Sequence, residues 1–251
     1  MIPNILKPAR LFLPLILIAC APIEGAAESL PVTVFKNLRE GKKQTVITYG
    51  TRLTHKGAWT KSLAGYFEKK FPGQVTFLNT ARSGMTSEWG VENLQARVLK
   101  HRPDLVFIEF SANDAATKHH ISTEQSEANL DRMVKELRQQ NPQVDIVLQT
   151  MNPAWDSPKT PDKKFGSERP DMEAYYDVCR RYAHEHNLPL VDNWPNWLKI
   201  LKEQPEQYHK MVSDGIHPHS GPSLAVTWPA VEALLEKARA AASIRRKEVS
   251  Q

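Results

Sequence analysis

Asp214 and His217 are the residues whose types and spacing best suit general acid–base chemistry. They lie three positions apart in the segment Ser-Asp-Gly-Ile-His, residues 213–217, where Gly215 permits a tight bend. A carboxylate that turns back onto an imidazole fixes the ring tautomer and supports its cationic form. An Asp-x-x-His match is common by chance, but this one precedes Pro218 and the last helical pattern of the chain. We therefore predict a histidine base with an orienting carboxylate.

Two further positions could donate hydrogen bonds to an oxyanion that forms during a reaction. Gly84 follows an expected strand, and its backbone N–H can approach a ligand because no side chain intervenes. Asn113 lies in Ser-Ala-Asn-Asp, residues 111–114, behind the next strand, and offers a side-chain amide. Each residue alone is an ordinary turn residue. Their order, each behind a successive strand, is the specific signal.

Strands and helices alternate along the part of the chain that must position these residues. Short apolar runs rich in β-branched residues predict strands, and apolar residues at helical spacing predict the helices between them. The expected strands cover residues 45–48, 75–78, 105–110, 145–148 and 188–191. This alternation predicts one α/β domain, a three-layer α/β/α sandwich with a five-stranded parallel sheet of flavodoxin-like type. In such sheets, ligands bind beyond the carboxyl ends of the strands.

Residues 49–54, Tyr-Gly-Thr-Arg-Leu-Thr, follow the first expected strand directly. Together with Gly84, residues 111–114 and residues 213–217, they resemble the four sequence blocks of the SGNH hydrolases, the GDSL-type esterases and lipases. Block three of that family normally opens with glycine, and Ser111 replaces it here. The resemblance covers most of the chain after residue 43 and implies an SGNH-type hydrolase domain over residues 44–240.

The resemblance also implies an activity and a role for each residue. The expected reaction is hydrolysis of carboxylic esters, with O-acetyl groups of an extracellular carbohydrate or lipid as the first expected substrate and with no cofactor. His217 would be the base and Asp214 its orienting partner. Gly84, Asn113 and the backbone N–H of residue 52 would stabilise the oxyanion.

Arg52 occupies the position at which the family has its nucleophilic serine. A guanidinium group stays protonated and cannot attack a carbonyl carbon. A fixed positive charge at this point would also disfavour a cationic His217 and so weaken it as a base. Arg52 could instead pair with Asp214, or hold an anionic ligand such as a carboxylate or a phosphate.

Three interpretations of Arg52 remain open from the sequence. In the first, the chain is a working acylhydrolase that uses a nearby hydroxyl, and Thr51 and Thr54 are the nearest. In the second, it is a catalytically impaired relative that binds glycan or acyl ligands in the inherited pocket. In the third, arginine is a recent or artificial substitution in an otherwise intact enzyme.

Other reactive side chains carry weaker signals. Ser111 and Ser213 stand at expected strand or loop ends, where serines usually satisfy backbone groups. No histidine pair has cysteine or carboxylate residues nearby at the spacing of zinc ligands, so we predict no metal site. Cys179 lies on the apolar side of a helical pattern and is expected to be a small buried residue.

The N-terminal residues are typical of an exported bacterial protein. A basic start and a short apolar middle predict a signal peptide within residues 1–27, with cleavage near residues 19/20 or 27/28. The first site would leave a lipidated Cys20 and a membrane tether, and the second a protein without a lipid. Either places the chain in the periplasm, at the outer membrane or outside the cell. We expect residues 28–43 to be a tether and residues 241–251 a basic tail.

The overall charge and one long segment indicate which partners the protein binds and how they reach the site. The formal net charge of +5 is spread along the chain without a basic stripe interleaved with aromatic residues, so we predict no nucleic-acid partner. The expected partner is instead a small-molecule or polysaccharide ester. Residues 152–170 are rich in proline and charge and predict a long surface loop that shapes access to the site.

Overall fold

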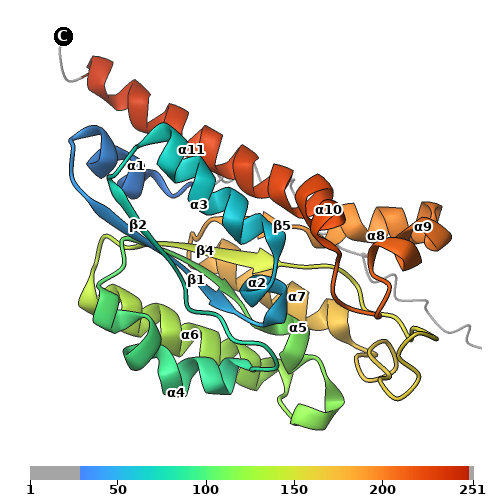
Figure 1. Cartoon of the computed structure of the whole chain (residues 1–251). Helices are drawn as coiled ribbons and strands as arrows, with labels where there is room; N and C mark the ends of the chain where they lie inside the picture. Colours follow the sequence, from blue (N-terminus) through green and yellow to red (C-terminus); the bar gives the residue numbers. More distant parts are fainter. Residues whose placement is uncertain (1–28, 249–251) are drawn as a thin grey trace, which may run out of the picture.

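The computed structural model describes residues 29–248 and contains a parallel sheet of five strands in the order β2-β1-β3-β4-β5 (Figure 1). The order and the flanking helices confirm the predicted α/β/α sandwich. The strands are β1 (Gln44–Gly50), β2 (Val75–Asn79), β3 (Leu105–Glu109), β4 (Asp145–Thr150) and β5 (Leu190–Asp192).

The sheet has helices on both faces, as its nearly continuous apolar strands require. The longer helices are α1 (Val32–Arg39), α3 (Ala58–Lys70), α4 (Ser87–Arg97), α6 (Thr123–Gln140), α7 (Met172–Glu185), α8 (Trp194–Glu203) and α11 (Trp228–Glu248). Helices α1, α3 and α11 cover one face, and α4, α6 and α7 cover the other (Figure 1). Short helical segments are α2 (Arg52–His55), η1 (Leu99–His101), α5 (Ser111–Asp114), η2 (Thr117–His119), α9 (Pro205–Met211), α10 (Ser220–Pro222) and η3 (Ser223–Thr227).

Alternate residues of each strand divide between the two faces of the sheet. Val46 and Phe107 pack with the α1, α3 and α11 layer, whereas Ile47 and Ile108 pack with the α4, α6 and α7 layer. Because all strands are parallel, their carboxyl ends lie at one edge of the sheet. Helix α2 follows β1 and helix α5 follows β3, so the segments of the predicted site begin at this edge.

The predicted tether at residues 28–43 is wrong, because much of it is a packed helix. Val34, Phe35 and Leu38 of α1 are buried in the core beside α11. The backbone N–H of Val34 donates to the carboxylate of Asp145 at 2.7 Å, which ties the start of α1 to β4. The folded unit therefore includes α1.

The last helix also differs from the predicted domain boundary at residue 240. Helix α11 continues to Glu248, and Ala242 belongs to the same core cluster as α1. Most of the segment predicted as a tail is therefore helix. Residues 1–28, with the predicted signal peptide and Cys20, lie outside the described residues. No helix within residues 29–248 combines the length and the apolar character needed to cross a bilayer.

Gly50, the last residue of β1, lies close to β3 at the edge that carries the site. A Cβ atom at this position would meet the carbonyl oxygen of Glu109 at 2.3 Å. Because that atom is backbone, the two strands would have to shift. We expect Gly50→Ala to lower the free energy of unfolding by about 1–3 kcal/mol, measured by chemical denaturation.

Gly65→Ala is the matched control for this prediction. Gly65 lies within α3, where nothing lies within 4 Å of an added Cβ atom. The helix should therefore gain about 0.5–1 kcal/mol from this substitution. Equal stability changes in the two variants would contradict the close approach of β1 and β3.

Candidate active site

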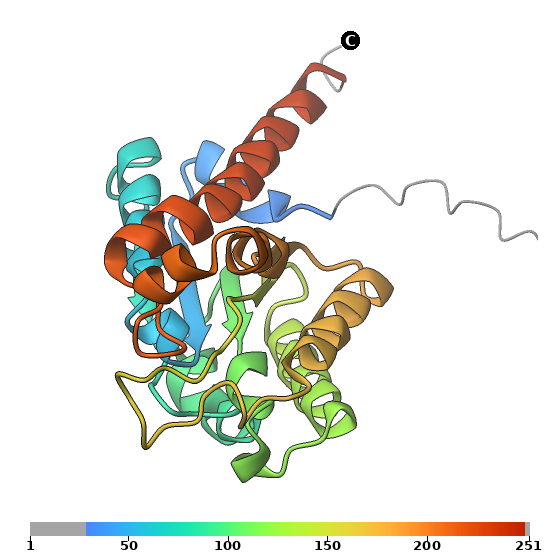
Figure 2. The ribbon, with the colours of Figure 1, turned by 90° about the vertical axis from the view of Figure 1, so that its right-hand side faces the viewer.

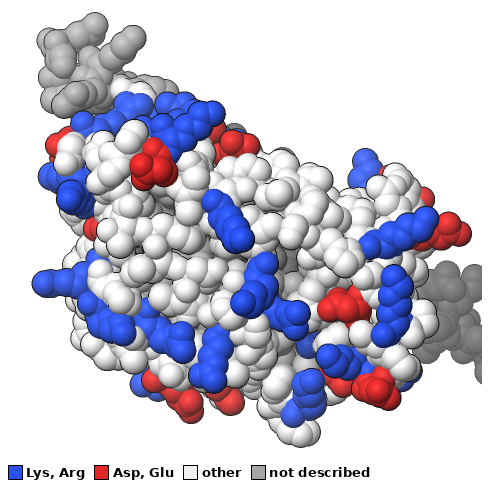
Figure 3. Space-filling model, viewed as in Figure 1, with Lys and Arg blue, Asp and Glu red and all other residues white. Residues whose placement is uncertain are grey.

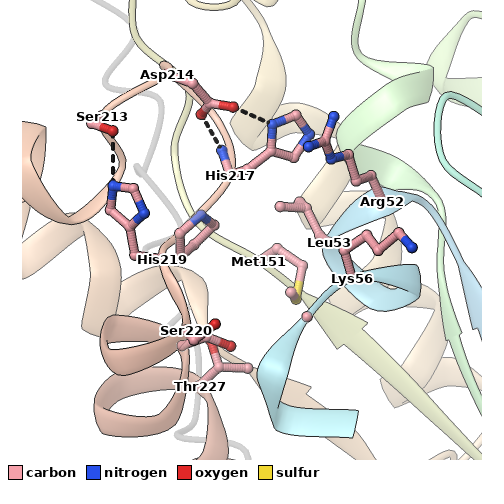
Figure 4. Close-up of a pocket in the computed structure, with 13 residues that line it drawn as sticks. Arg52, Leu53, Lys56, Met151, Ser213, Asp214, His217, His219, Ser220 and Thr227 are labelled. Atoms are coloured by element: carbon pink, nitrogen blue, oxygen red, sulfur yellow. Dashed lines mark hydrogen bonds and ion pairs between the residues drawn. The ribbon is translucent and has the colours of Figure 1, made fainter.

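The carboxylate of Asp214 binds His217 through both of its oxygens. Its Oδ2 lies 2.6 Å from Nδ1 of His217, and its Oδ1 accepts the backbone N–H groups of His217 at 2.8 Å and Ile216 at 3.1 Å (Figure 4). Partial burial raises the pKa of Asp214, but the hydrogen bonds from His217 and the backbone outweigh it and hold that pKa well below its usual value. The carboxylate therefore stays ionised and orients the imidazole so that Nε2 is left to accept a proton.

The long loop that follows β4 packs against the segment that carries this pair. Figure 2 shows loop 152–170, in yellow, beside α2 and α5 at the end of the sheet where the strands finish. The backbone N–H of Trp155 donates to the carbonyl of Gly215 at 2.8 Å, and the Thr160 hydroxyl donates to the carbonyl of Asp214 at 2.8 Å. The Phe165 ring contacts the His217 imidazole edge-on at a centroid distance of 5.8 Å. The predicted loop is thus present, and it holds the histidine segment in place.

The bend at Gly215 is one position where only glycine fits. Its φ angle is +105°, and an added Cβ atom would meet the carbonyl oxygen of Trp155 at 2.5 Å. This conformation lets the chain reverse between Asp214 and His217. The sequence-based expectation of a tight bend therefore agrees with the backbone.

Arg52 is the first residue of α2 and is exposed to solvent. Figure 4 shows its guanidinium beside the His217 ring, and both side chains line two adjoining cavities. The expected alternative of an Arg52–Asp214 pair is wrong, because the Asp214 carboxylate is bound by His217 and the backbone instead. Within residues 29–248, the Arg52 guanidinium has no hydrogen-bond or ion-pair partner.

The hydroxyls of Thr51 and Thr54, the predicted substitute nucleophiles, are bound to a buried carboxyl group. Both side chains are buried and donate to Oε2 of Glu109, at 2.7 Å from Thr51 and 3.1 Å from Thr54. The Thr51 hydroxyl also accepts the backbone N–H of Leu53 at 3.2 Å and so caps α2. Neither hydroxyl is therefore free to attack a carbonyl, and this arrangement corrects the prediction.

Glu109, the last residue of β3, is a buried carboxyl group that the sequence analysis missed. Burial raises its pKa to about 8, against the hydrogen bonds from Thr51 and Thr54. It is therefore largely neutral at pH 7 and accepts hydrogen bonds from the turn that presents Arg52. An acidic residue at the end of the apolar run 105–110 was the available signal.

Gly84 and Asn113 face the second of the two cavities, as do Arg52 and His217. Gly84 has a φ angle of +80°, which favours glycine in the turn after β2. The Asn113 amide donates to the carbonyl of Met85 at 2.8 Å, which fixes the side chain against that turn. An amide has a second N–H, so Asn113 can also donate into the cavity. The structure thus brings the predicted base and oxyanion donors to one place.

Two cavities meet at Arg52 and His217. The first, of about 310 Å³, is also lined by Lys56, Ser213 and His219. The second, of about 430 Å³, extends toward Gly84, Asn113 and loop 152–170. The wall shared by the cavities carries the reactive imidazole, so a ligand in either one can reach it.

The remaining side chains considered from the sequence lie elsewhere or have other partners. The Ser213 hydroxyl forms a hydrogen bond with Nε2 of His219, at 2.8 Å, rather than with His217. Cys179 is buried, and burial raises the pKa of its thiol to about 12. No group of three or more His, Cys, Asp or Glu side chains suited to a metal ion occurs in the described part of the chain.

A model of the GDSL-like lipase/acylhydrolase family matches residues 47–220. The chain belongs to this family. The match covers all four sequence blocks and confirms the resemblance inferred from them. Membership of an acylhydrolase family places the chain among carboxylic ester hydrolases.

Three proteins with related sequences come from bacteria. Thioesterase 1/protease 1/lysophospholipase L1 of Escherichia coli (strain K12) is 25% identical over 173 residues, which cover 69% of this chain and 72% of that protein. An arylesterase of Vibrio mimicus is 28% identical over 144 residues, covering 57% of this chain and 62% of the other. An uncharacterized lipoprotein of Bacillus subtilis (strain 168) is 26% identical over 143 residues, covering 51% and 58% respectively.

Solved structures share the fold of this family member. An α/β hydrolase from the metagenome of Lake Arreo superposes with a TM-score of 0.62 at 23% identity, covering 78% of this chain and 96% of the other. A catalytic mutant of an acetylxylan esterase from Geobacillus stearothermophilus gives a TM-score of 0.61 at 21% identity, covering 77% and 94%. These similarities establish the architecture at the level of the sheet and its helices.

Proposed function

We propose that this protein hydrolyses carboxylic esters, with His217 as the general base. The observation that carries the proposal is the Asp214–His217 contact of 2.6 Å beside two cavities. Membership of an acylhydrolase family supports it. O-acetyl groups on an extracellular carbohydrate or lipid are the proposed substrate, since one structurally similar protein is an acetylxylan esterase.

Water is the proposed nucleophile, because Arg52 stands at the serine position and Thr51 and Thr54 are bound to Glu109. Nε2 of His217 takes a proton from water as the water oxygen bonds to the ester carbonyl carbon. Gly84 and Asn113 donate to the oxygen that becomes negative. The bond from carbon to the alcohol oxygen then breaks, and His217 returns the proton to that oxygen. The products are a carboxylic acid and an alcohol.

Export is part of the same proposal. The N-terminal basic and apolar pattern supports it, and one relative is named a lipoprotein. Lipidation at Cys20 would tether the enzyme to a membrane, and cleavage near residues 27/28 would release it without a lipid.

Hydrolysis of 4-nitrophenyl acetate by the native protein and by His217→Ala tests this function. We expect the variant to lose about 10²- to 10⁴-fold in kcat/KM, which is the usual contribution of a positioned base. His184→Ala, an exposed histidine of α7, is the control and should behave as the native protein does. Equal rates for the native protein and His217→Ala would overturn the proposal.

Ligand binding without turnover is the second candidate function. The guanidinium at the serine position favours it, since the family reaction through a serine cannot begin there. A native protein that binds acylated oligosaccharides but leaves 4-nitrophenyl acetate intact would support this alternative.

A further inference from the structure

Arg52 and Lys56 lie one helical turn apart and line the first cavity. Both side chains are exposed, and neither forms an ion pair or a side-chain hydrogen bond with another residue in the range 29–248. In Figure 4 both extend from the α2 side of the cavity, and Figure 3 shows basic side chains at the surface over α2. Partial burial lowers the pKa of the adjacent His55, and the charges of Lys56, Arg97 and Arg52 lower it further, as expected in a positive field.

The cavity holds no free negative charge to balance these two cations. Asp214 is the sole carboxylate among the described residues that line it. That carboxylate already accepts the His217 imidazole and two backbone N–H groups. The local charge is therefore positive at neutral pH, and a negative group of a ligand would be attracted.

The second cavity is lined by both basic and acidic residues. Besides Arg52, it is lined by Lys118, which pairs with Glu168 at 3.4 Å, and by the exposed Lys163, whose Nζ lies 6.0 Å from the centroid of the Phe165 ring. Asp162 also lines this cavity. Arg169 is buried and donates to the backbone carbonyls of Ala112 and Phe165. Arg52 thus faces both cavities, and Lys56 is the second cation that lines the first cavity beside it.

The opposite wall of the first cavity carries polar, uncharged side chains besides Asp214. Ser213, His219 and Ser220 lie there, across from Arg52 and Lys56 in Figure 4. Hydroxyl and imidazole groups can exchange hydrogen bonds with the hydroxyls of a sugar or glycerol unit. A volume of about 310 Å³ is at the lower end of the usual range for small-molecule sites.

We infer that the first cavity binds an ester substrate that also carries an anionic group, either a carboxylate or a phosphate. Arg52 and Lys56 hold this group beside His217. The inference rests on the proposed function and gives it a substrate class. A guanidinium group presents a fork of N–H donors that matches both oxyanions, and a lysine adds a point charge. Arg52 would thus serve as a specificity residue at the position of the missing nucleophile.

Calorimetric titration at low ionic strength tests the inference without any need for turnover. The probes are trigalacturonate and its uncharged methyl ester for the carboxylate arm, and glycerol 1-phosphate and glycerol for the phosphate arm. We expect the native protein to bind at least one charged probe about ten- to a hundredfold more tightly than its neutral counterpart, as hydrogen bonds to charged groups allow. The pair of probes with the larger difference in affinity shows whether the bound group is a carboxylate or a phosphate. Salt should reduce the preference.

Variants locate the charge preference in the cavity. Arg52→Gln and Lys56→Gln should each reduce it about tenfold or more, whereas Lys61→Gln, an exposed lysine of α3, should keep it. Equal binding of charged and neutral probes, or a preference retained in Arg52→Gln, would overturn the inference. His217→Ala should lose ester hydrolysis yet keep the preference, so failure of the proposed function would be seen separately.

Discussion

Arg52→Ser is expected to raise hydrolysis of 4-nitrophenyl acetate by about 10³-fold or more over the native protein. In a related catalytic arrangement, loss of the nucleophilic serine lowers kcat by about 10⁶-fold. Restoring a serine at this position can therefore raise the rate by several orders of magnitude. The base, its carboxylate and the oxyanion donors are already placed around this position. The introduced hydroxyl would stand at the start of α2 beside His217, where its proton can pass to Nε2.

Two measurements check this expectation. The first is kcat/KM on the neutral acetyl ester, and the second is covalent labelling by a fluorophosphonate, located by mass spectrometry at residue 52. Arg52→Ala is the matched control, because it removes the guanidinium without supplying a nucleophile. Equal activity of Arg52→Ser and Arg52→Ala, with no label in either, would mean that the remaining groups are not positioned for acyl transfer.

Glu109→Gln is expected to stabilise the protein strongly at alkaline pH. In the unfolded chain, Glu109 ionises near its ordinary pKa of 4.5, whereas burial raises the folded-state value to about 8. The unfolded state therefore releases the proton first, and the native protein loses stability as pH rises from about 4.5 to 8. A shift of this size corresponds to about 5 kcal/mol at and above pH 8.

The glutamine side chain avoids this loss because it carries no proton to release. Its carbonyl oxygen can still accept the hydroxyls of Thr51 and Thr54. Chemical denaturation at pH 5, 7 and 9 should show the variant gaining on the native protein as pH increases. Glu92→Gln, on the exposed side of α4, is the control and should not change the pH profile in this way. Parallel profiles for the native protein and Glu109→Gln would rule out a neutral buried carboxyl group.

Both predictions concern the same turn, between β1 and α2, from its two sides. Arg52 lies on the exposed side and faces the cavities, whereas Thr51 and Thr54 lie on the buried side and bind Glu109. A buried carboxyl group beneath the turn therefore holds the backbone from which residue 52 projects. The site has kept a base and its supports although the attacking group of the family is absent.

Some helices could be predicted from the spacing of apolar residues, and others could not. The helix expected between the strands at 105–110 and 145–148 is α6, in which Leu130, Met133, Val134 and Leu137 bury one face at helical spacing. Helix α8 was missed, although Trp194, Trp197, Leu198 and Leu201 repeat in the same way. Helix α1 lies within the predicted tether because its mixed composition gives no clear helical pattern. Its three core residues are buried against α11, which lies far along the chain.

The amino-acid sequence by itself determined the architecture and the membership of the site. Apolar strand runs alternating with helical patterns specify a parallel sheet, and a parallel sheet brings the ends of its strands to one edge. Asp214 and His217 are so close in sequence that a glycine bend suffices to join them. Gly84 and Asn113 follow β2 and β3, the strands on either side of β1, so their approach to the pair was foreseeable.

Only the tertiary structure decided how each side chain at that edge is used. The hydroxyls of Thr51 and Thr54 are bound because the pairing of β1 with β3 sets Gly50 opposite Glu109. Arg52 is left unpaired among the described residues because Asp214 finds its donors within its own loop. The first of these outcomes depends on contacts between segments more than fifty residues apart, whose register and burial local sequence patterns do not encode.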